Sequence, residues 1–376
     1  MAGIYIHIPF CRQACTYCNF HFSTSLSLKH NFLAALNNEI MLTVPFAADE
    51  IINTIYFGGG TPSLLSVPEL STILQLLKNK FTIREDAEIT LEANPDDINT
   101  SILKSWQGCG INRLSLGVQS FFEKELIWMN RAHNAAEALQ SIDDIIEAGF
   151  KNFSVDLIYG SPLLSNEELI KNTEIIFNKN IPHISCYALT VEPKTALNKM
   201  IDEYKSAPVN AGQQAEQFQL LLTLTEQAGY EQYEISNFAK PGYRSRHNSS
   251  YWQGKPYYGF GPAAHSFDGK NIRRWNIANN ALYIQSLKNN IIPFEEEVLT
   301  QTQQLNEYIM TSLRTVEGLN VEKVQNDFGE KEAEKILEQS KKYLYQKLMK
   351  EEKGFIFLTK QGKFLADGIA ADLFFE

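Results

Sequence analysis

The strongest constraint on the fold of this chain is a group of three cysteines near its start. Cys11, Cys15 and Cys18 directly follow an apolar run over residues 3–9. Three cysteines so close together cannot all pair, and only two more occur in the chain, so a disulfide framework is not expected. Three thiolates can instead bind three irons of a [4Fe–4S] cube and leave the fourth iron without a protein ligand. An iron with an open position is a reactive site, as in catalytic metal centres generally.

A structural zinc site is the alternative for the same cysteines. It would add a histidine such as His7 or His21 as a further ligand. The cysteines alone do not decide between iron and zinc. The other two, Cys109 and Cys186, are scattered along the chain, and we expect neither to have a catalytic role. Cysteine usage of this kind is typical of the reducing cytoplasm.

The composition narrows the functional class. Hydrophobic residues make up 44% of the chain and charged residues 21%, as in an ordinary globular protein. A formal net charge of −10 argues against general binding to nucleic acid or to an anionic membrane surface. No apolar run approaches the length of a transmembrane helix, and no basic segment opens the chain. We therefore expect a cytoplasmic protein without a signal peptide or a membrane span.

Short apolar runs alternate with segments of helical periodicity along the first half of the chain. The runs predict strands over residues 4–8, 53–57, 88–92, 113–117, 153–158 and 183–188. The helical segments cover residues 28–42, 67–80, 98–106 and 166–178, with further helix up to residue 148. Six β–α units in regular order imply a parallel sheet. We predict an α/β fold with an open (partial) β/α barrel of about six parallel strands, not the closed eight-strand form.

The regular alternation of strand and helix patterns ends after residue 192. A helix is predicted over residues 211–228 and one more strand over residues 230–238. Later helices are predicted over residues 279–288, 300–314, 330–350 and 361–374, with a strand over residues 354–359. We therefore divide the chain into a barrel domain (1–240), a connecting aromatic- and glycine-rich segment (241–292) and a mostly helical, winged-helix-like domain (293–376). Because the chain is acidic, we expect the last domain to serve packing and not DNA binding.

The cysteine spacing resembles that of a known superfamily. Cys11-x3-Cys15-x2-Cys18, with the aromatic Tyr17 before the last cysteine, resembles the cluster loop of radical S-adenosylmethionine (SAM) enzymes. The stretch Tyr5-Ile-His-Ile-Pro-Phe-Cys11 is similar to the branch that contains oxygen-independent coproporphyrinogen III dehydrogenase and the HemW heme chaperones. The resemblance implies a [4Fe–4S] cluster bound by these three cysteines, and bound SAM.

Further motifs stand at the ends of the predicted strands, where a barrel of parallel strands gathers its reactive groups. Gly58-Gly-Gly-Thr-Pro62 follows the second strand, and its backbone N–H groups are expected to approach a charged ligand. Glu92 ends the third strand and is a candidate acceptor for ribose hydroxyls, and Arg131 is a candidate ion-pair partner for Asp156. The resemblance implies that SAM contacts Tyr5, Tyr17, Gly59, Gly60, Thr61, Glu92, Gln119, Arg131 and Asp156. Some of these positions serve a second SAM in the dehydrogenase.

The resemblance also implies a chemistry. The amino and carboxylate groups of SAM chelate the open iron, and an external donor of the flavodoxin or ferredoxin type reduces the cluster. One electron then cleaves SAM to methionine and a 5′-deoxyadenosyl radical. The barrel orients SAM and excludes water and oxygen.

Two departures separate this chain from the dehydrogenase. The dehydrogenase has a further cysteine two residues after the triplet, where this chain has Phe20, and it has a substantial extension before its first strand. In turn, His247-Asn-Ser-Ser-Tyr-Trp252 resembles the heme-binding motif of HemW proteins. Imidazole is a common axial ligand of heme iron, and the Tyr251 and Trp252 rings can cover a porphyrin face. His265 is a weaker second candidate ligand.

We therefore expect a radical SAM-type heme chaperone that binds heme and passes it to an acceptor protein. The alternative is an enzyme that oxidatively decarboxylates coproporphyrinogen III to protoporphyrinogen IX, and the residues leave open whether the chain is an enzyme at all. The expected partners are heme, an electron donor and a heme acceptor of unknown identity. We expect no nucleic acid, and peripheral membrane association only through the acceptor.

Overall fold

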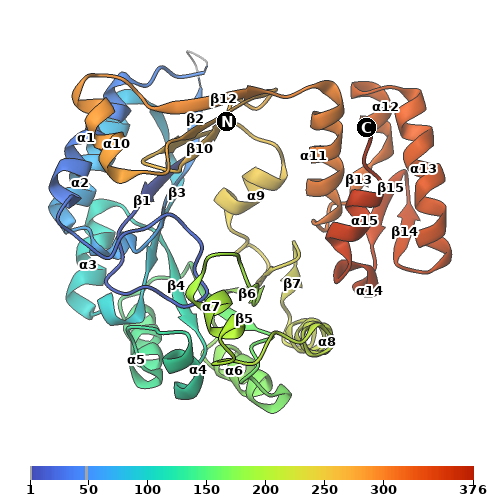
Figure 1. The fold of residues 1–376 in the computed structure, drawn as a ribbon, viewed down its shortest axis with the longest axis horizontal. Coiled ribbons are helices and arrows are strands. Elements are labelled where there is room, and N and C mark those ends of the chain that lie inside the picture. Colours follow the sequence, from blue (N-terminus) through green and yellow to red (C-terminus); the bar gives the residue numbers. More distant parts are fainter. Residues whose placement is uncertain (1, 47–49) are drawn as a thin grey trace.

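A curved sheet of twelve strands dominates the computed structural model, which describes residues 2–46 and 50–376 (Figure 1). Its centre is formed by parallel strands in chain order: β1 (Ala2–Ile8), β2 (Ile51–Gly59), β3 (Thr82–Ala93), β4 (Arg113–Gln119), β5 (Phe153–Tyr159) and β6 (His183–Ala188). The predicted open barrel of about six parallel strands is confirmed within the described residues. The strands are nearly continuous buried runs, as expected for a sheet covered on both faces.

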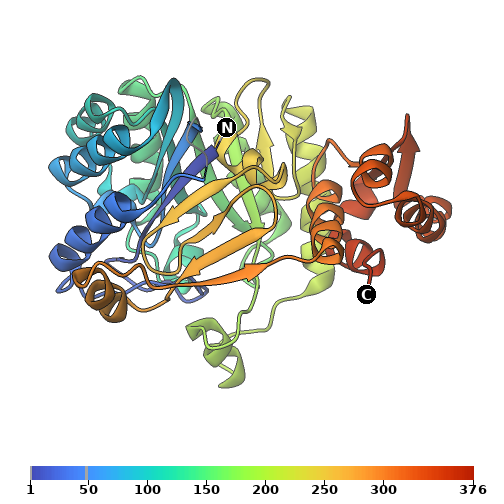
Figure 2. The same ribbon diagram turned by 90° about the horizontal axis from the view of Figure 1, so that it is seen from above.

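Helices cover the outer, convex face of the sheet (Figures 1 and 2). They are α1 (Lys29–Leu42), α2 (Val67–Lys80), α3 (Thr100–Cys109), α4 (Glu123–Trp128), α5 (Ala135–Glu147) and α6 (Asn166–Asn178), with short 3₁₀ turns at Pro62–Leu64 and Pro95–Asp97. Three of them begin with a capping box, in which the N-cap side chain and a glutamate three residues later satisfy the free N–H groups reciprocally. Each of these caps marks the point where a loop on the carboxyl side of a strand ends and a helix begins.

The sheet continues on both sides with strands that the sequence patterns did not show correctly. Residues 230–238 form a hairpin, β7 (Glu231–Gln232) and β8 (Asn237–Ala239), and not one strand, because the Glu234 carboxylate accepts from the Ser236 N–H (3.0 Å) and stabilises a turn. Beyond β1, β9 (Tyr257–Phe260) is parallel, whereas β10 (His265–Phe267), β11 (Ile272–Asn276) and β12 (Phe294–Val298) are antiparallel.

The strands β9 to β11 lie within residues 241–292, the segment interpreted from the sequence as a connection. They lack a recognisable apolar pattern because β11 and β12 are held together partly by charge. Arg274 on β11, for example, pairs with Glu296 on β12 (2.5 Å). Helices α7 (Ala196–Asp202) and α8 (Ala211–Gln227) follow β6, α9 (Arg246–Trp252) lies inside the curve of the sheet, and α10 (Asn280–Lys288) packs beside α1 (Figure 1).

A second, smaller unit forms the C-terminal end of the chain (Figure 2). It contains α11 (Gln301–Leu313), β13 (Leu319–Asn320), α12 (Val321–Asp327), α13 (Glu330–Tyr345), β14 (Met349–Glu352), β15 (Phe355–Leu358), α14 (Lys360–Lys363) and α15 (Ala366–Asp372). Helix α13 is shorter than the predicted 330–350, since residues 349–352 pair with β15 instead. The unit has a hydrophobic core of its own. None of the described helices is long and apolar enough to cross a membrane.

A buried carboxylate ties the added strands to the barrel. Glu39 on α1 accepts hydrogen bonds from the Gly261 N–H (2.8 Å), the Asn276 amide (2.5 Å) and the Tyr283 hydroxyl (2.5 Å). Its side chain is almost fully buried, and this burial raises its pKa to about 7. Glu39 therefore connects α1 with β11, α10 and the loop between β9 and β10.

We expect Glu39→Ala to lower the free energy of unfolding by about 3 kcal/mol or more, because it leaves three buried donors without an acceptor. Urea denaturation followed by circular dichroism measures this change. Asn31→Ala, an exposed position on the same helix, is the control and should change the value by less than about 0.5 kcal/mol. Equal stability of the two variants would show that Glu39 is not a structural anchor.

Candidate functional site

A cavity of about 810 Å³ opens at the carboxyl ends of the parallel strands, facing the C-terminal unit. Nearly all residues that the sequence analysis assigned to a site line this cavity. They are Cys11, Cys15, Tyr17, Cys18, Gly59, Gly60, Thr61, Glu92, Gln119, Arg131 and Asp156. Tyr5 and His247 do not line it. The topology therefore brings together residues spread over some 150 positions of sequence, as expected at this end of a β/α barrel.

The cysteine loop is fixed to the ends of two strands. The Cys11 N–H donates to the carbonyl of Ser23 (3.0 Å), which closes the loop. Arg131 donates from Nη1 to Cys15 Sγ (3.2 Å) and from Nη2 to the Gly117 carbonyl (2.7 Å) and to the Asn94 side chain (2.8 Å). The predicted ion pair between Arg131 and Asp156 is not formed, because the guanidinium is used to hold Cys15 against the end of β4.

The two histidines named as further ligands of a zinc site are engaged in other hydrogen bonds. In the part of the chain that the structure describes, no three His, Cys, Asp or Glu side chains lie close enough to hold one metal ion together. His7 Nε2 donates to the His21 carbonyl (2.8 Å), and burial lowers the His7 pKa to about 4. His21 is bonded to Asn280 (2.7 Å). A [4Fe–4S] cube needs only one thiolate at each of three separate irons, and three thiols facing one cavity supply these.

The glycine turn after β2 has a different role from the one predicted. The Gly60 N–H donates to the Ile8 carbonyl (2.8 Å) and the Thr61 N–H donates to the Phe10 carbonyl (2.7 Å), so neither is free for a ligand. A Cβ atom on Gly60 would lie 2.5 Å from the Phe10 carbonyl oxygen. Gly59 has a φ of +107°, which favours glycine. The turn therefore holds the first residues of the cysteine loop against the second strand.

Two partly buried carboxyl groups line the cavity. Glu92 accepts from the Tyr56 hydroxyl (2.7 Å), and burial raises its pKa to about 8. Burial likewise raises the pKa of Asp156 to about 6, and Ser115 donates to it (3.4 Å). Gln119, at the end of β4, has a φ of +69°, a strained conformation of the kind that is found at binding sites. These groups offer neutral or weakly charged hydrogen-bonding partners to a polar ligand.

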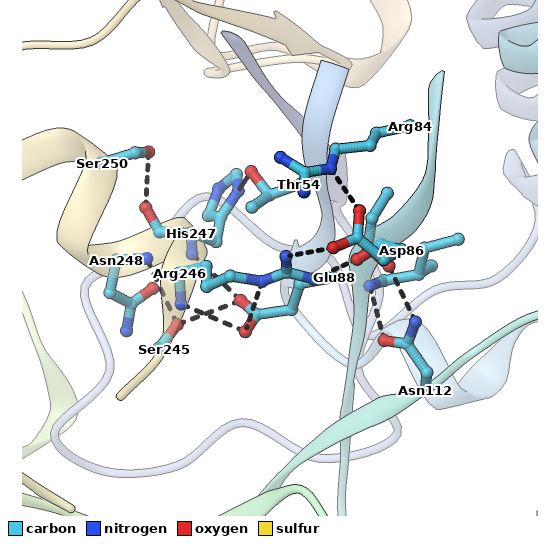
Figure 3. A network of polar contacts seen from close by, with 12 residues as sticks. Thr54, Arg84, Asp86, Glu88, Asn112, Ser245, Arg246, His247, Asn248 and Ser250 are labelled. Carbon is cyan, nitrogen blue, oxygen red and sulfur yellow. Dashed lines mark hydrogen bonds and ion pairs between the residues drawn. The ribbon is translucent and has the colours of Figure 1, made fainter. Parts of the chain in front are cut away.

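His247 lies in a buried network on α9 (Figure 3) and is not among the residues that line the cavity. Its side chain is only 1% exposed, with Nδ1 hydrogen-bonded to the Thr54 hydroxyl (2.8 Å) and Nε2 to the Tyr251 hydroxyl (2.8 Å). Its backbone N–H donates to the buried Glu88 (3.0 Å). Because both ring nitrogens have partners, iron could reach His247 only after one of these hydrogen bonds opens.

Tyr56 connects this network to the cavity, and the sequence analysis did not identify it. Its ring stacks on that of His247, with centroids 5.0 Å apart, while its hydroxyl donates to Glu92. A tyrosine in the middle of a buried parallel strand was the available signal. Among the other sequence candidates, Cys186 is buried on β6, Cys109 lies on the outer helix layer near Ser71 (3.1 Å), and His265 is exposed on β10.

Burial lowers the pKa of His247 from 6.5 to about 3. Since the unfolded chain takes up this proton at higher pH than the folded chain, the contribution to stability is complete above about pH 6.5 and is lost as the pH falls toward 3. When the pH is lowered from 7 to 5, the free energy of unfolding of the original chain should fall because of His247. In His247→Asn this fall should be smaller by about 2 kcal/mol.

Urea denaturation at the two pH values measures this difference. His30→Asn is the control, because His30 on α1 is exposed and its surroundings change little on unfolding. If the original chain and the His247→Asn variant lose the same free energy between the two pH values, His247 is not held neutral in the folded state.

Comparison with known proteins gives the family. A model of the radical SAM superfamily matches residues 5–176, and a model of the HemN C-terminal domain matches residues 299–365. The chain is 32% identical over 375 residues to "Heme chaperone HemW" of Bacillus subtilis, with 98% of both chains covered. It is 39% identical over 285 residues to the protein of the same name from Escherichia coli, with 72% of both chains covered.

Among solved structures, coproporphyrinogen III oxidase (HemN) from Escherichia coli superimposes with a TM-score of 0.86 over 99% of this chain and 89% of that one. At 23% identity, this likeness shows the fold alone. In contrast, the 32% identity to the Bacillus subtilis protein extends over both units of the chain. An identity of this size over 98% of the chain shows that the two proteins belong to one family. The chain therefore belongs to the HemW heme chaperone family of the radical SAM superfamily.

Proposed function

We propose that this protein is a radical SAM-type heme chaperone, which binds heme and passes it to an acceptor protein. The observation that carries the proposal is its similarity, over 98% of the chain, to a relative named as a heme chaperone. A second observation separates it from the dehydrogenase. Phe20 is 67% exposed and lines the cavity at the position where the dehydrogenase keeps a further cysteine.

Membership of the radical SAM superfamily implies a [4Fe–4S] cluster and SAM. Cys11, Cys15 and Cys18 would hold the cluster, which supplies one electron to SAM when it is bound. Arg131 supports this role, because its guanidinium stabilises negative charge on the Cys15 sulfur. The contacts of the loop with Ser23 and Arg131 keep the thiols at the cavity wall.

The remaining cavity residues would bind SAM. Gly59, Gly60 and Thr61 line the cavity beside the cysteines, and we assign the amino-acid end of SAM to this turn, although the Gly60 and Thr61 N–H groups are already hydrogen-bonded within the protein. Glu92 is the candidate partner of its ribose. Tyr17, Gln119, Arg131 and Asp156 complete this proposed set, all within the same cavity. Tyr5 would act indirectly, since its ring packs on Tyr56 (6.2 Å) and its hydroxyl contacts His7 (3.1 Å).

Ligation of heme iron by His247 remains part of the proposal as a separate step. It requires the imidazole to exchange the Tyr251 or Thr54 hydroxyl for iron, and α9 to move away from β1 and β2. The low pKa favours this chemistry, because a neutral imidazole is the form that binds metal. We further propose that the protein acts in the cytoplasm, receives electrons from an external donor and passes heme to an acceptor protein.

Parallel assays on one anaerobically reconstituted sample test the function against its alternative. We expect heme binding at about one molecule per chain and no turnover of coproporphyrinogen III. Cys15→Ala should lose the cluster absorbance, whereas Cys109→Ala, outside the cavity, should keep it. A sample with a full cluster that turns over coproporphyrinogen III and does not bind heme would reverse the assignment in favour of the dehydrogenase.

A second experiment concerns SAM. Loss of a buried hydrogen bond to the ribose costs about 1–3 kcal/mol, so we expect Glu92→Ala to weaken SAM binding roughly ten- to a hundredfold. Equilibrium binding of SAM to the reconstituted protein measures the effect. Glu85→Ala is the matched control, because Glu85 lies on the same strand but is exposed. Unchanged affinity in the Glu92 variant, with the cluster present, would remove Glu92 from the site.

A further inference from the structure

One side chain lies between the proposed SAM site and the motif helix α9. Tyr56 on β2 is 8% exposed and is not among the residues that line the cavity. Its hydroxyl donates to Glu92 Oε1 (2.7 Å), and Glu92 does line the cavity. Its ring stacks on that of His247, with the centroids 5.0 Å apart and the planes at 23°. Tyr56 therefore contacts one group of the SAM cavity and one group of the buried network on α9.

Two glycines make room for this arrangement. A Cβ atom on Gly58 would lie 2.9 Å from the ring of Tyr56 and 3.1 Å from Glu92 Oε1. A Cβ atom on Gly3, on the neighbouring strand β1, would lie 3.4 Å from the His247 ring. The two rings are therefore packed without spare space. In an interior of this density, a displacement of one ring is transmitted to the other.

Release of His247 toward a heme iron would disturb Tyr56. The imidazole is held by the hydroxyl groups of Thr54 and Tyr251 (2.8 Å each), and one of its faces lies against the Tyr56 ring. Ligation requires one of these hydrogen bonds to open and the imidazole to leave its stacked position. A Tyr56 ring that is free to follow the imidazole makes this opening easier, whereas a Tyr56 ring that is fixed in place makes it harder.

Bound SAM would fix Tyr56 more firmly through Glu92. Burial raises the pKa of Glu92 to about 8, so its carboxyl group is mostly neutral at pH 7 without a ligand. SAM carries a sulfonium cation next to its ribose, and a cation close to a carboxyl group favours the ionised form. A hydrogen bond to an ionised acceptor is roughly twice as strong as one between neutral groups. The hydroxyl of Tyr56 would then be held in its present position.

We propose that Tyr56 couples the two sites, so that bound SAM favours the closed network around His247 and weakens the binding of heme. This inference rests on the proposed function and adds a mode of regulation to it. SAM acts here as an effector, and none of its bonds is broken. Coupling between binding sites is reciprocal, so bound heme must weaken SAM binding by the same factor. A carrier has to release its cargo, and the entry of SAM would favour that release.

Heme affinity with and without saturating SAM tests the coupling on the original chain. Titrations of the reconstituted protein, followed by the Soret band of heme, are made with the cluster oxidised so that SAM is not cleaved. We expect SAM to weaken heme binding about fivefold, at the lower end of the usual range for two coupled sites. Equal heme affinity with and without SAM would overturn the coupling.

A second ligand separates the effect of charge from that of occupancy. S-adenosylhomocysteine keeps the ribose of SAM and lacks the sulfonium charge. We expect it to weaken heme binding by less than about twofold, because Glu92 then stays mostly neutral. An effect as large as that of SAM would overturn the part assigned to the charge of Glu92. Neither measurement needs a variant, so neither can fail through misfolding.

Tyr56→Phe then tests the residue itself. This variant keeps the ring that stacks on His247 and loses only the hydroxyl, so the effect of SAM on heme affinity should fall below about twofold. Tyr258→Phe is the matched control, because Tyr258 on β9 is 2% exposed and its hydroxyl also donates to a carboxylate, that of Glu50. The control should keep the full effect of SAM. A purely structural role of Tyr56 would not change this ratio of two heme affinities.

The outcomes separate this inference from the function on which it rests. If the original chain does not bind heme or does not bind SAM, the proposed function fails and the coupling with it. If both ligands bind and the effect of SAM is the same in Tyr56→Phe as in Tyr258→Phe, the function stands and Tyr56 does not couple the sites. A much larger effect of SAM that persists in Tyr56→Phe would show that the two ligands compete for one space, which also overturns the proposal.

Discussion

The candidate site depends on two backbone hydrogen bonds, from Gly60 to Ile8 and from Thr61 to Phe10. They place the start of the cysteine loop directly against the second strand, which only a residue without a Cβ permits at Gly60. Arg131 secures the other side of the loop from the end of β4. Contacts with the barrel itself therefore hold the loop at Cys11 and at Cys15. Such preorganisation reduces the ordering cost of binding.

Burial determines the charge of the groups around this site. The pKa values of Glu92 and Asp156 are raised and the pKa of His247 is lowered, in each case mainly because the charged form loses its hydration. Tyr56 links two of them, since it donates to Glu92 and stacks on His247. Burial thus favours the neutral forms of Glu92 and His247, whereas Asp156, with a pKa of about 6, is largely ionised at pH 7. The link also connects the proposed SAM site with the motif helix through one side chain.

The C-terminal unit forms one wall of the cavity at the mouth of the barrel. It is joined to the barrel by polar contacts such as Lys360 with Glu226 (2.6 Å) and Arg244 with Glu317 (2.8 Å), and it has a separate hydrophobic core. The interface also contains apolar contacts, since the rings of Phe218 and Phe364 lie 5.9 Å apart and Ile235 packs against the core of the C-terminal unit.

The sequence by itself determined the parallel core and most of the site. Buried strands show as apolar runs, helices show as periodicity, and the carboxyl ends of parallel strands must meet, so Cys11, Glu92 and Asp156 could be placed together without coordinates. The tertiary structure alone decided what depends on partners distant in sequence. Only the structure shows that ion pairs hold further strands on the sheet and that His247 lies between two hydroxyl groups. Only the structure shows that Arg131 donates to a thiol and not to a carboxylate, and that Lys363 lines the cavity. No local pattern encodes such contacts, because hydrogen bonds and charges find their partners only after the chain has packed.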